Sequence, residues 1–281
     1  MANLALVSLD INHGAATATT TALESLGHTV TKYTSASATK SVLKTYDVIF
    51  WVRGADNAAY TAEVIGAFND GIPVISAYAG GVNVTSNMPM QAANLVSGSV
   101  STTGFSSQNS VQILESSPYF SGLGGVGDTV QVASSSTFII PIDVSQIADG
   151  VNKLSCAPGL SAKINIMVAP KGTINLLGSP TPAPMAHLSF MYSSYAPDGT
   201  TILGRVLDSF LTPPKVISGV ITDVAGNLVQ RKVIAVNLTT DLVSAVTTSD
   251  VDGTYSFSLD GDAEHAVFCV DNVAAPLIYV G

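Results

Sequence analysis

The chain has 281 residues, of which 11% are charged and 47% are hydrophobic, and its formal net charge is −9. This acidic balance excludes the phosphate neutralisation on which nucleic-acid binding depends, and it disfavours contact with anionic membranes. Intrinsic disorder is excluded too, because the apolar content is high enough to build sizeable cores. The length predicts one large domain or two unequal ones.

The opening residues 1–7 lack the cationic start of a signal peptide, and Asp10 follows too soon for an apolar leader. No window reaches the roughly 20 apolar residues of a membrane span. We therefore expect a protein that is made in the cytoplasm and is not held in a membrane.

The first hundred residues alternate apolar runs with amphipathic stretches, which is typical of an α/β fold with an open parallel sheet. A sheet of this kind usually carries its site at the carboxyl ends of the strands. The expected strands are Leu4–Leu9, His28–Tyr33, Val48–Val52 and Ile72–Ser76, and the expected helices are Ala15–Leu26, Ser37–Lys44 and Asn57–Asn69.

Between about residues 82 and 180, Ser-rich and Gly-rich turns separate short apolar runs, which predicts additional and partly antiparallel strands. A helix over Pro197–Leu211 closes this region, and Pro213-Pro214 then forms a stiff linker. The additional strands are expected at Val111–Leu114, Val130–Val132, Phe138–Ile142 and Ile164–Val168, with Ile174–Leu177 and His187–Phe190 as returning strands.

After the linker, short alternating strands recur about every ten residues without a helix, which predicts a small β-sandwich. They are expected at Val216–Thr222, Val229–Val236, Val243–Thr248, Tyr255–Leu259, Ala266–Val270 and Ile278–Val280. Residues 1–213 hold 8 basic and 12 acidic groups (−4) and residues 214–281 hold 3 and 8 (−5), which together give −9. We thus expect an α/β domain over 1–213 and a more acidic sandwich over 216–281.

Two groups of residues have the chemistry of a ligand site, and the spacing within each group decides whether it could be one. Asp250, Asp252, Asp260, Asp262 and Glu264 offer oxygen ligands for calcium, but Tyr255 stands where a calcium loop needs glycine. Asp252-Gly253 is better explained as a hairpin turn. The hydroxyls of Thr17–Thr21 lie inside a helical pattern without a Gly-rich loop, so they do not predict bound flavin or nucleotide. We expect no metal and no cofactor.

The two cysteines, Cys156 and Cys269, lie far apart in apolar surroundings. A pair of buried thiols is the favoured interpretation, and a disulfide between them remains the alternative.

The large domain resembles the class I glutamine-amidotransferase-like group, particularly its trehalose-utilisation branch. The segments that carry the resemblance are Leu4–Ser8, Leu26–Val30, Tyr46–Ile49, Gly71–Ile75, Gly172–Gly178 and Ala196–Gly199. The resemblance implies a flavodoxin-like open sheet and, in enzymes of the group, a cysteine nucleophile on a tight turn after the fourth strand.

That turn contains no thiol here, because it reads Ser76-Ala77-Tyr78-Ala79-Gly80-Gly81. Ser76 would need a base, and none of the four histidines (His13, His28, His187, His265) stands at a recognisable spacing from it. A Ser76–His187 pair is the one catalytic alternative, and a buried, hydrogen-bonded Ser76 is favoured. We therefore predict a chain that is not an enzyme and has no catalytic residues.

The small domain resembles the carboxypeptidase-regulatory-like, transthyretin-like sandwich of bacterial surface proteins and bacteriophage virion proteins. The segments that carry this resemblance are Ile217–Asp223, Ala225–Asn227, Arg231–Val236, Thr248–Phe257 and Ala274–Ile278. It implies a non-enzymatic structural protein of a bacteriophage virion, in the tail, the collar or the head surface. The partners would be other virion proteins and further copies of the chain. An amidotransferase-like hydrolase with an unrecognised site remains an alternative, as does a bacterial surface or adhesion protein, which the absent signal peptide disfavours.

Overall fold

The structure is a computed structural model, and it divides the chain into two compact units, Met1–Leu211 and Thr212–Gly281. The division lies beside the predicted linker, whose Pro213 and Pro214 are outside the described residues. In the part of the chain described, no helix is long and apolar enough to cross a membrane. The described residues are 1–53, 58–77, 88–97, 107–135, 137–138, 142–190, 194–212, 215–238, 243–259, 264–270 and 278–279.

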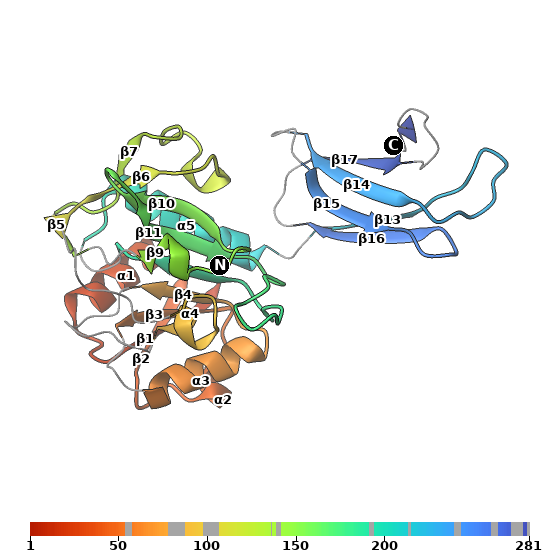
Figure 1. The fold of residues 1–281 in the computed structure, drawn as a ribbon. Helices are drawn as coiled ribbons and strands as arrows, with labels where there is room; N and C mark the ends of the chain where they lie inside the picture. The colour runs from red at the N-terminus through yellow and green to blue at the C-terminus, as the bar shows by residue number, and fades with distance from the viewer. Residues whose placement is uncertain are drawn as a thin grey trace. The chain divides into compact units, whose positions relative to one another are not determined.

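Unit 1 is built on a ten-stranded mixed sheet (Figure 1). Five neighbouring strands, β2, β1, β3, β4 and β12, run parallel, and the strands beyond them pair antiparallel. The sequence-based prediction of an α/β fold followed by a β region is confirmed at this level. The strand order is β2 (Thr29–Thr34), β1 (Asn3–Ser8), β3 (Val48–Arg53), β4 (Val74–Ala77), β12 (Met185–Leu188), β11 (Leu160–Ala169), β10 (Asn152–Ala157), β6 (Ser110–Ile113) and β7 (Thr129–Gln131), with β9 (Ile142–Asp143) paired to β11.

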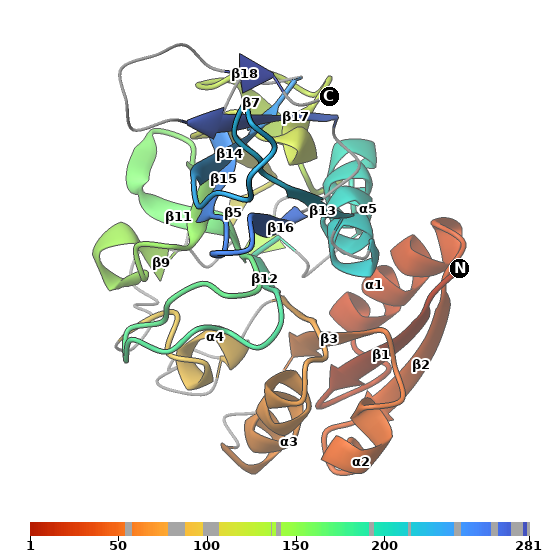
Figure 2. The same cartoon turned by 90° about the vertical axis from the view of Figure 1, so that its right-hand side faces the viewer.

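Helices cover both faces of the sheet (Figures 1 and 2). One face packs against α2 (Lys40–Leu43), α3 (Ala58–Asn69) and α4 (Pro89–Ala92), and the other packs against α1 (Gly14–Ser25) and α5 (Pro197–Leu211). Strand β3 shows why the sequence demands this: Ile49 and Trp51 lie in the first core, while Phe50 and Val52 lie in the second. A continuous apolar run needs burial on both sides.

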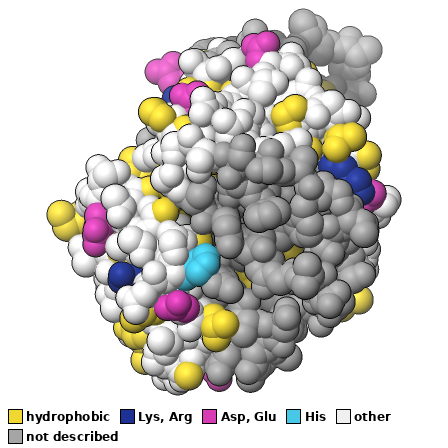
Figure 3. Space-filling model, turned by 90° about the vertical axis from the view of Figure 1, so that its left-hand side faces the viewer, with side chains coloured by type: hydrophobic (Ala, Val, Ile, Leu, Met, Phe, Trp, Pro, Cys, Tyr) yellow, Lys and Arg dark blue, Asp and Glu magenta, His cyan; other side chains and the backbone are white. Residues whose placement is uncertain are grey.

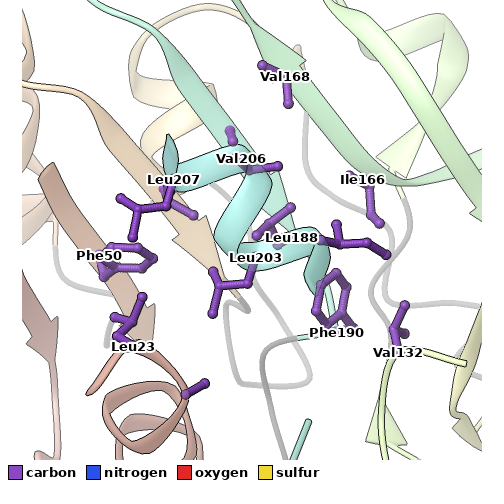
Figure 4. Close-up of a cluster of buried hydrophobic side chains, with 14 of the residues drawn as sticks. Leu23, Phe50, Val132, Ile166, Val168, Leu188, Phe190, Leu203, Val206 and Leu207 are labelled. Atoms are coloured by element: carbon purple, nitrogen blue, oxygen red, sulfur yellow. The ribbon is translucent and has the colours of Figure 1, made fainter. Parts of the chain in front are cut away.

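Helix α5 is the main element of the second core. Its Leu203, Val206 and Leu207 are fully buried and lie among Phe50, Leu188 and other apolar side chains of the sheet (Figure 4). The helix begins against the segment after β7, where Ala196 N–H donates to the Val132 carbonyl over 3.1 Å.

Two strand predictions in unit 1 are wrong. Ile174–Leu177 is a surface loop, because Gly172 and Gly178 adopt φ of 86° and 78° and reverse the chain at both ends. Asn175 completes the turn by accepting hydrogen bonds from the backbone N–H groups of Leu177 and Ser179, both over 3.0 Å. The expected strand Phe138–Ile142 is divided between β8 (Thr137–Phe138) and β9, with 139–141 outside the described residues.

Strand β10 was not predicted at all. It fills the sheet between β11 and β6. The remaining short elements of unit 1 are β5 (Ser107–Gln108), which pairs with β8, and the 3-10 turns Pro118–Phe120 and Val144–Gln146.

Unit 2 contains two small antiparallel sheets around one core. The first consists of β13 (Lys215–Val220) and β16 (Thr254–Leu259), and the second has the order β15 (Val243–Thr248), β14 (Lys232–Asn237), β17 (His265–Val270) and β18 (Ile278–Tyr279). Strands of both sheets contribute to the buried core, which comprises Ile221, Val233, Ala235, Phe257, Leu259 and Val267.

The predicted turn at Asp252-Gly253 is present, but it does not form a hairpin. Gly253 has φ 75°, and its N–H donates to the Asp250 carbonyl over 2.9 Å. The strands on either side, β15 and β16, pair in different sheets. The turn therefore carries the chain from one sheet to the other.

Candidate functional site

The candidate site lies at the carboxyl ends of β4 and β12, where Ser76 and His187 meet. Each is the third residue of its strand, and the parallel register places them directly opposite one another. Ser76 Oγ lies 3.1 Å from His187 Nδ1, and both residues are buried. The structure thus brings together the one serine and histidine that the sequence had suggested only as an alternative.

The hydrogen bonds of Ser76 determine which neighbouring atom receives its hydroxyl proton. Ser76 Oγ also lies 3.1 Å from the carbonyl oxygen of Ala186, which can only accept. When the single hydroxyl proton goes to that carbonyl, His187 must carry its own proton at Nδ1 and donate to Ser76. For Ser76 to act as a nucleophile, its proton would have to turn towards His187 instead.

Further buried polar side chains continue this site along the same edge. Ser189 follows β12 and lies between Leu188 and Phe190, which both belong to the core of α1 and α5, so its side chain lies on the opposite face, with His187. Its N–H donates to the Asn165 carbonyl of β11 over 3.0 Å, which places Asn165 beside it. Asn165 Oδ1 and Nδ2, Ser189 Oγ and Ser155 Oγ are buried and have no hydrogen-bond partner among the described residues.

The sequence analysis missed Asn165 and Ser189. A polar residue within an apolar run is the only signal that either one gives. Most of the predicted turn over Ser76–Gly81 falls in residues 78–87, which lie outside the described residues, so the structure does not test the conformation expected there.

The other sequence candidates are placed in structural roles. Thr17–Thr21 lies within α1, as expected. Asp252 Oδ1 accepts from the N–H and the hydroxyl of Thr254, over 3.0 and 2.7 Å, and these bonds lower its pKa. Among the described residues, no group of three or more His, Cys, Asp or Glu could hold a metal ion, and Asp260 and Asp262 fall outside them.

The two cysteines are thiols in different units. Cys156 is in β10 and Cys269 is in β17, and they are not joined by a disulfide. Burial raises the pKa of the Cys156 thiol, which leaves it protonated and unreactive at neutral pH.

A surface hollow of about 350 Å³ lies on the opposite face of the sheet from Ser76, beside α1 and the start of α5. Tyr195 forms one of its walls, and its hydroxyl lies 3.0 Å from Thr19 Oγ1. Burial raises the pKa of Tyr195, so the phenol stays protonated. The described residues that line the hollow are all uncharged: Ala18, Thr21, Ala22, Ser25, Ser194, Tyr195 and Thr200.

Comparison with known proteins assigns no family to this chain. No family model and no curated protein matches the chain. A solved structure described as "Structure of PurLQS from Thermotoga maritima" is similar to it with a TM-score of 0.45 and 15% identity, over 74% of this chain and 99% of that chain. A likeness at this level transfers neither an activity nor a substrate.

The prediction that the chain is not an enzyme is corrected, because the structure brings a serine hydroxyl, Ser76 Oγ, to 3.1 Å from an imidazole nitrogen, His187 Nδ1. The physical reason for the error is that the prediction rested on a missing thiol. A missing thiol excludes a thiolate nucleophile only, and the structure places a hydroxyl, Ser76, beside an imidazole, His187.

Proposed function

We propose that this chain is a structural protein of a bacteriophage particle, in which neighbouring subunits cover its uncharged surface. The observation that carries the proposal is the exposure of large apolar side chains on a chain with few charges. Ile174, Leu176 and Leu177 lie together on one loop and are 54%, 46% and 72% exposed, and only 11% of the residues of the chain are charged. Few of the described side chains on the face shown in Figure 3 are charged. Apolar area of this kind marks contact surfaces.

The assignment to a virion rests on the resemblance of residues 216–281 to transthyretin-like sandwiches of phage particles. Within this proposal, unit 2 is such a sandwich and unit 1 is a flavodoxin-like, amidotransferase-like domain. Two small sheets around a shared core suit the first assignment, and five parallel strands covered on both faces suit the second.

Labelled antibodies against the purified chain test the proposal on particles of the phage that encodes it. We expect regular labelling at one location in negative-stain images, and the chain among the proteins released from washed particles. Particles that carry neither label nor chain would refute the structural role.

A hydrolase is the second candidate, and the contact between Ser76 Oγ and His187 Nδ1 favours it. In this function, Ser76 Oγ attacks an ester or amide carbonyl while His187 accepts the hydroxyl proton, and His187 passes that proton to the alcohol or amine that leaves. Water then hydrolyses the serine ester, releasing the acid and restoring the Ser76 hydroxyl. The test is turnover of small ester and carboxamide substrates by the full chain and by Ser76→Ala. Ser8→Ala is the matched control, because it removes a buried hydroxyl at the carboxyl end of β1, outside the candidate site. Activity that Ser76→Ala abolishes and Ser8→Ala retains supports the hydrolase, and equal rates in all three chains refute it.

A further inference from the structure

One face of the larger sheet of unit 2 carries apolar side chains although it is not part of the buried core. In strands β15, β14 and β17, which pair side by side (Figure 1), side chains alternate between the two faces of the sheet. Val233, Ala235 and Val267 belong to the core of unit 2. The residues between them and beside them in these strands therefore point away from that core, onto what we call the outer face.

The strand register arranges the outward side chains in rows across the sheet. Ile234 of the central strand β14 pairs with a residue of β15 on one side and a residue of β17 on the other, and so does Val236. Side chains paired in this way are in contact distance of one another. The two rows consist of Val246, Ile234 and Phe268, and of Val243, Val236 and Ala266.

This apolar outer face is partly exposed in the structure. Val243 and Val246 are 59% and 52% exposed, and Ile234 and Phe268 are half-buried. An antiparallel sheet with one face in water usually alternates apolar residues towards the core with polar residues towards water. Here both faces are apolar, which is typical of a sheet that packs against a further layer.

Side chains of opposite charge stand at the two ends of the outer face. Lys232 lies two residues before Ile234 on β14, so it belongs to the outer face at one end. Glu264 lies two residues before Ala266, and its carbonyl accepts from Leu238 N–H over 2.9 Å, which continues the pairing of β14 with β17 at the other end. Both charged side chains are exposed. Along the strands, the face is therefore positive, then apolar, then negative.

We propose that the outer face packs against the outer face of a second copy of the chain, with the strands of the two copies running in opposite directions, and so forms a two-fold dimer. Reversal of the strands sets Lys232 of each copy opposite Glu264 of the other and sets apolar rows against apolar rows. Strands running in the same direction would instead set Lys232 against Lys232 and Glu264 against Glu264. The charges thus favour a second copy as the occupant, and they select its orientation.

The expected contact has the geometry of packed β-sheets. Sheets that pack face to face lie about 10 Å apart, with their strands within about 30° of alignment. At that spacing the apolar rows supply the affinity by burial, and the long side chains of Lys232 and Glu264 meet at the rim and supply the orientation. Because the outer face is that of one small sheet, we expect a dimer that dissociates on dilution.

Sedimentation velocity of the full chain over a range of concentrations tests the proposal. Lys232→Glu should raise the dissociation constant of the dimer at least about tenfold, because it sets like charges against each other at both ends of the contact. Glu264→Lys should do the same, and the chain carrying both substitutions should recover the parent value. Lys171→Glu and Glu24→Lys are the matched controls, since they make the same changes of charge at exposed positions of unit 1 and should shift the constant by less than about twofold.

Val246→Asp tests the apolar centre of the contact. It places a carboxylate between the two sheets and should leave the chain monomeric at concentrations where the parent is dimeric, whereas Val126→Asp, at a residue of unit 1 that is 62% exposed, should leave the dimer unchanged. Circular dichroism of Val246→Asp checks that unit 2 still folds, and the charge-reversal variants test the contact without any substitution in the apolar rows.

Three results would overturn the proposal. A parent chain that is monomeric at every concentration would show that something other than a second copy covers the outer face. Equal dissociation constants for Lys232→Glu and Lys171→Glu would show that the dimer forms elsewhere. A doubly substituted chain that fails to recover the parent value would refute the reversed orientation. The inference goes beyond the proposed structural role, because the dimer needs no particle: a dimeric chain that is absent from particles would refute the virion role and leave this contact standing.

Discussion

The start of α5 offers a sharp test of how unit 1 is packed. Gly199 is buried, and a Cβ added there would lie 2.0 Å from the carbonyl oxygen of Val132 and 2.9 Å from its carbonyl carbon. Ordinary contacts of this kind begin at 3.4 Å, so Gly199→Ala must separate the helix from the backbone of Val132 by about 3.4 − 2.0 = 1.4 Å. Backbone atoms cannot rotate away as the end of a side chain can.

Two opposing effects set the expected magnitude. Overpacking of a core destabilises by about 1–3 kcal/mol, and a clash with backbone belongs at the upper end. Alanine in place of glycine in a helix offsets up to about 1 kcal/mol. We therefore expect Gly199→Ala to lower the free energy of unfolding by about 2 kcal/mol, which at 2–4 °C per kcal/mol lowers the melting temperature by about 4–8 °C.

Gly204→Ala is the matched control in the same helix. Its added Cβ would meet the side chain of Leu26 at 3.3 Å, and that side chain can give way. Helix propensity should then leave the melting temperature unchanged or raise it by about 2–4 °C. Thermal unfolding followed by circular dichroism measures the melting temperatures of the two variants and of the parent chain. Equal melting temperatures for Gly199→Ala and the parent chain would refute the close approach between α5 and Val132.

Three further outcomes are expected. Leu203→Ala should lower the free energy of unfolding by about 2–5 kcal/mol in urea titrations, because it empties a fully buried site in the α5 core. Asp143 has a pKa lowered to about 2 by its bonds from Ser145 and Lys163, so its contribution to stability is present above its ordinary pKa of 3.8 and is lost as pH falls towards 2. Asp143→Asn should remove that part of the acid unfolding profile. Residues 1–211 expressed alone should keep a cooperative calorimetric transition, because their two cores contain no residue of unit 2.

The parallel part of the sheet could be predicted because local pattern and burial agree there. The run Val48–Val52 is apolar throughout, and the structure buries every one of its side chains. Glycines at 27 and 71 follow the helices before β2 and β4, and both adopt positive φ. Such signals depend only on neighbouring residues in the sequence, so they predict strands and helix ends without knowledge of the tertiary contacts.

The errors occur where distant residues decide the conformation. The run Ile174–Leu177 is as apolar as a strand, but Asn175 and the flanking glycines fold it into a loop anchored on Ala93 and Asn94. Ser76 and His187 are 111 residues apart in sequence, and only the insertion of β12 beside β4 makes them neighbours. No spacing rule along the chain could reveal that pairing.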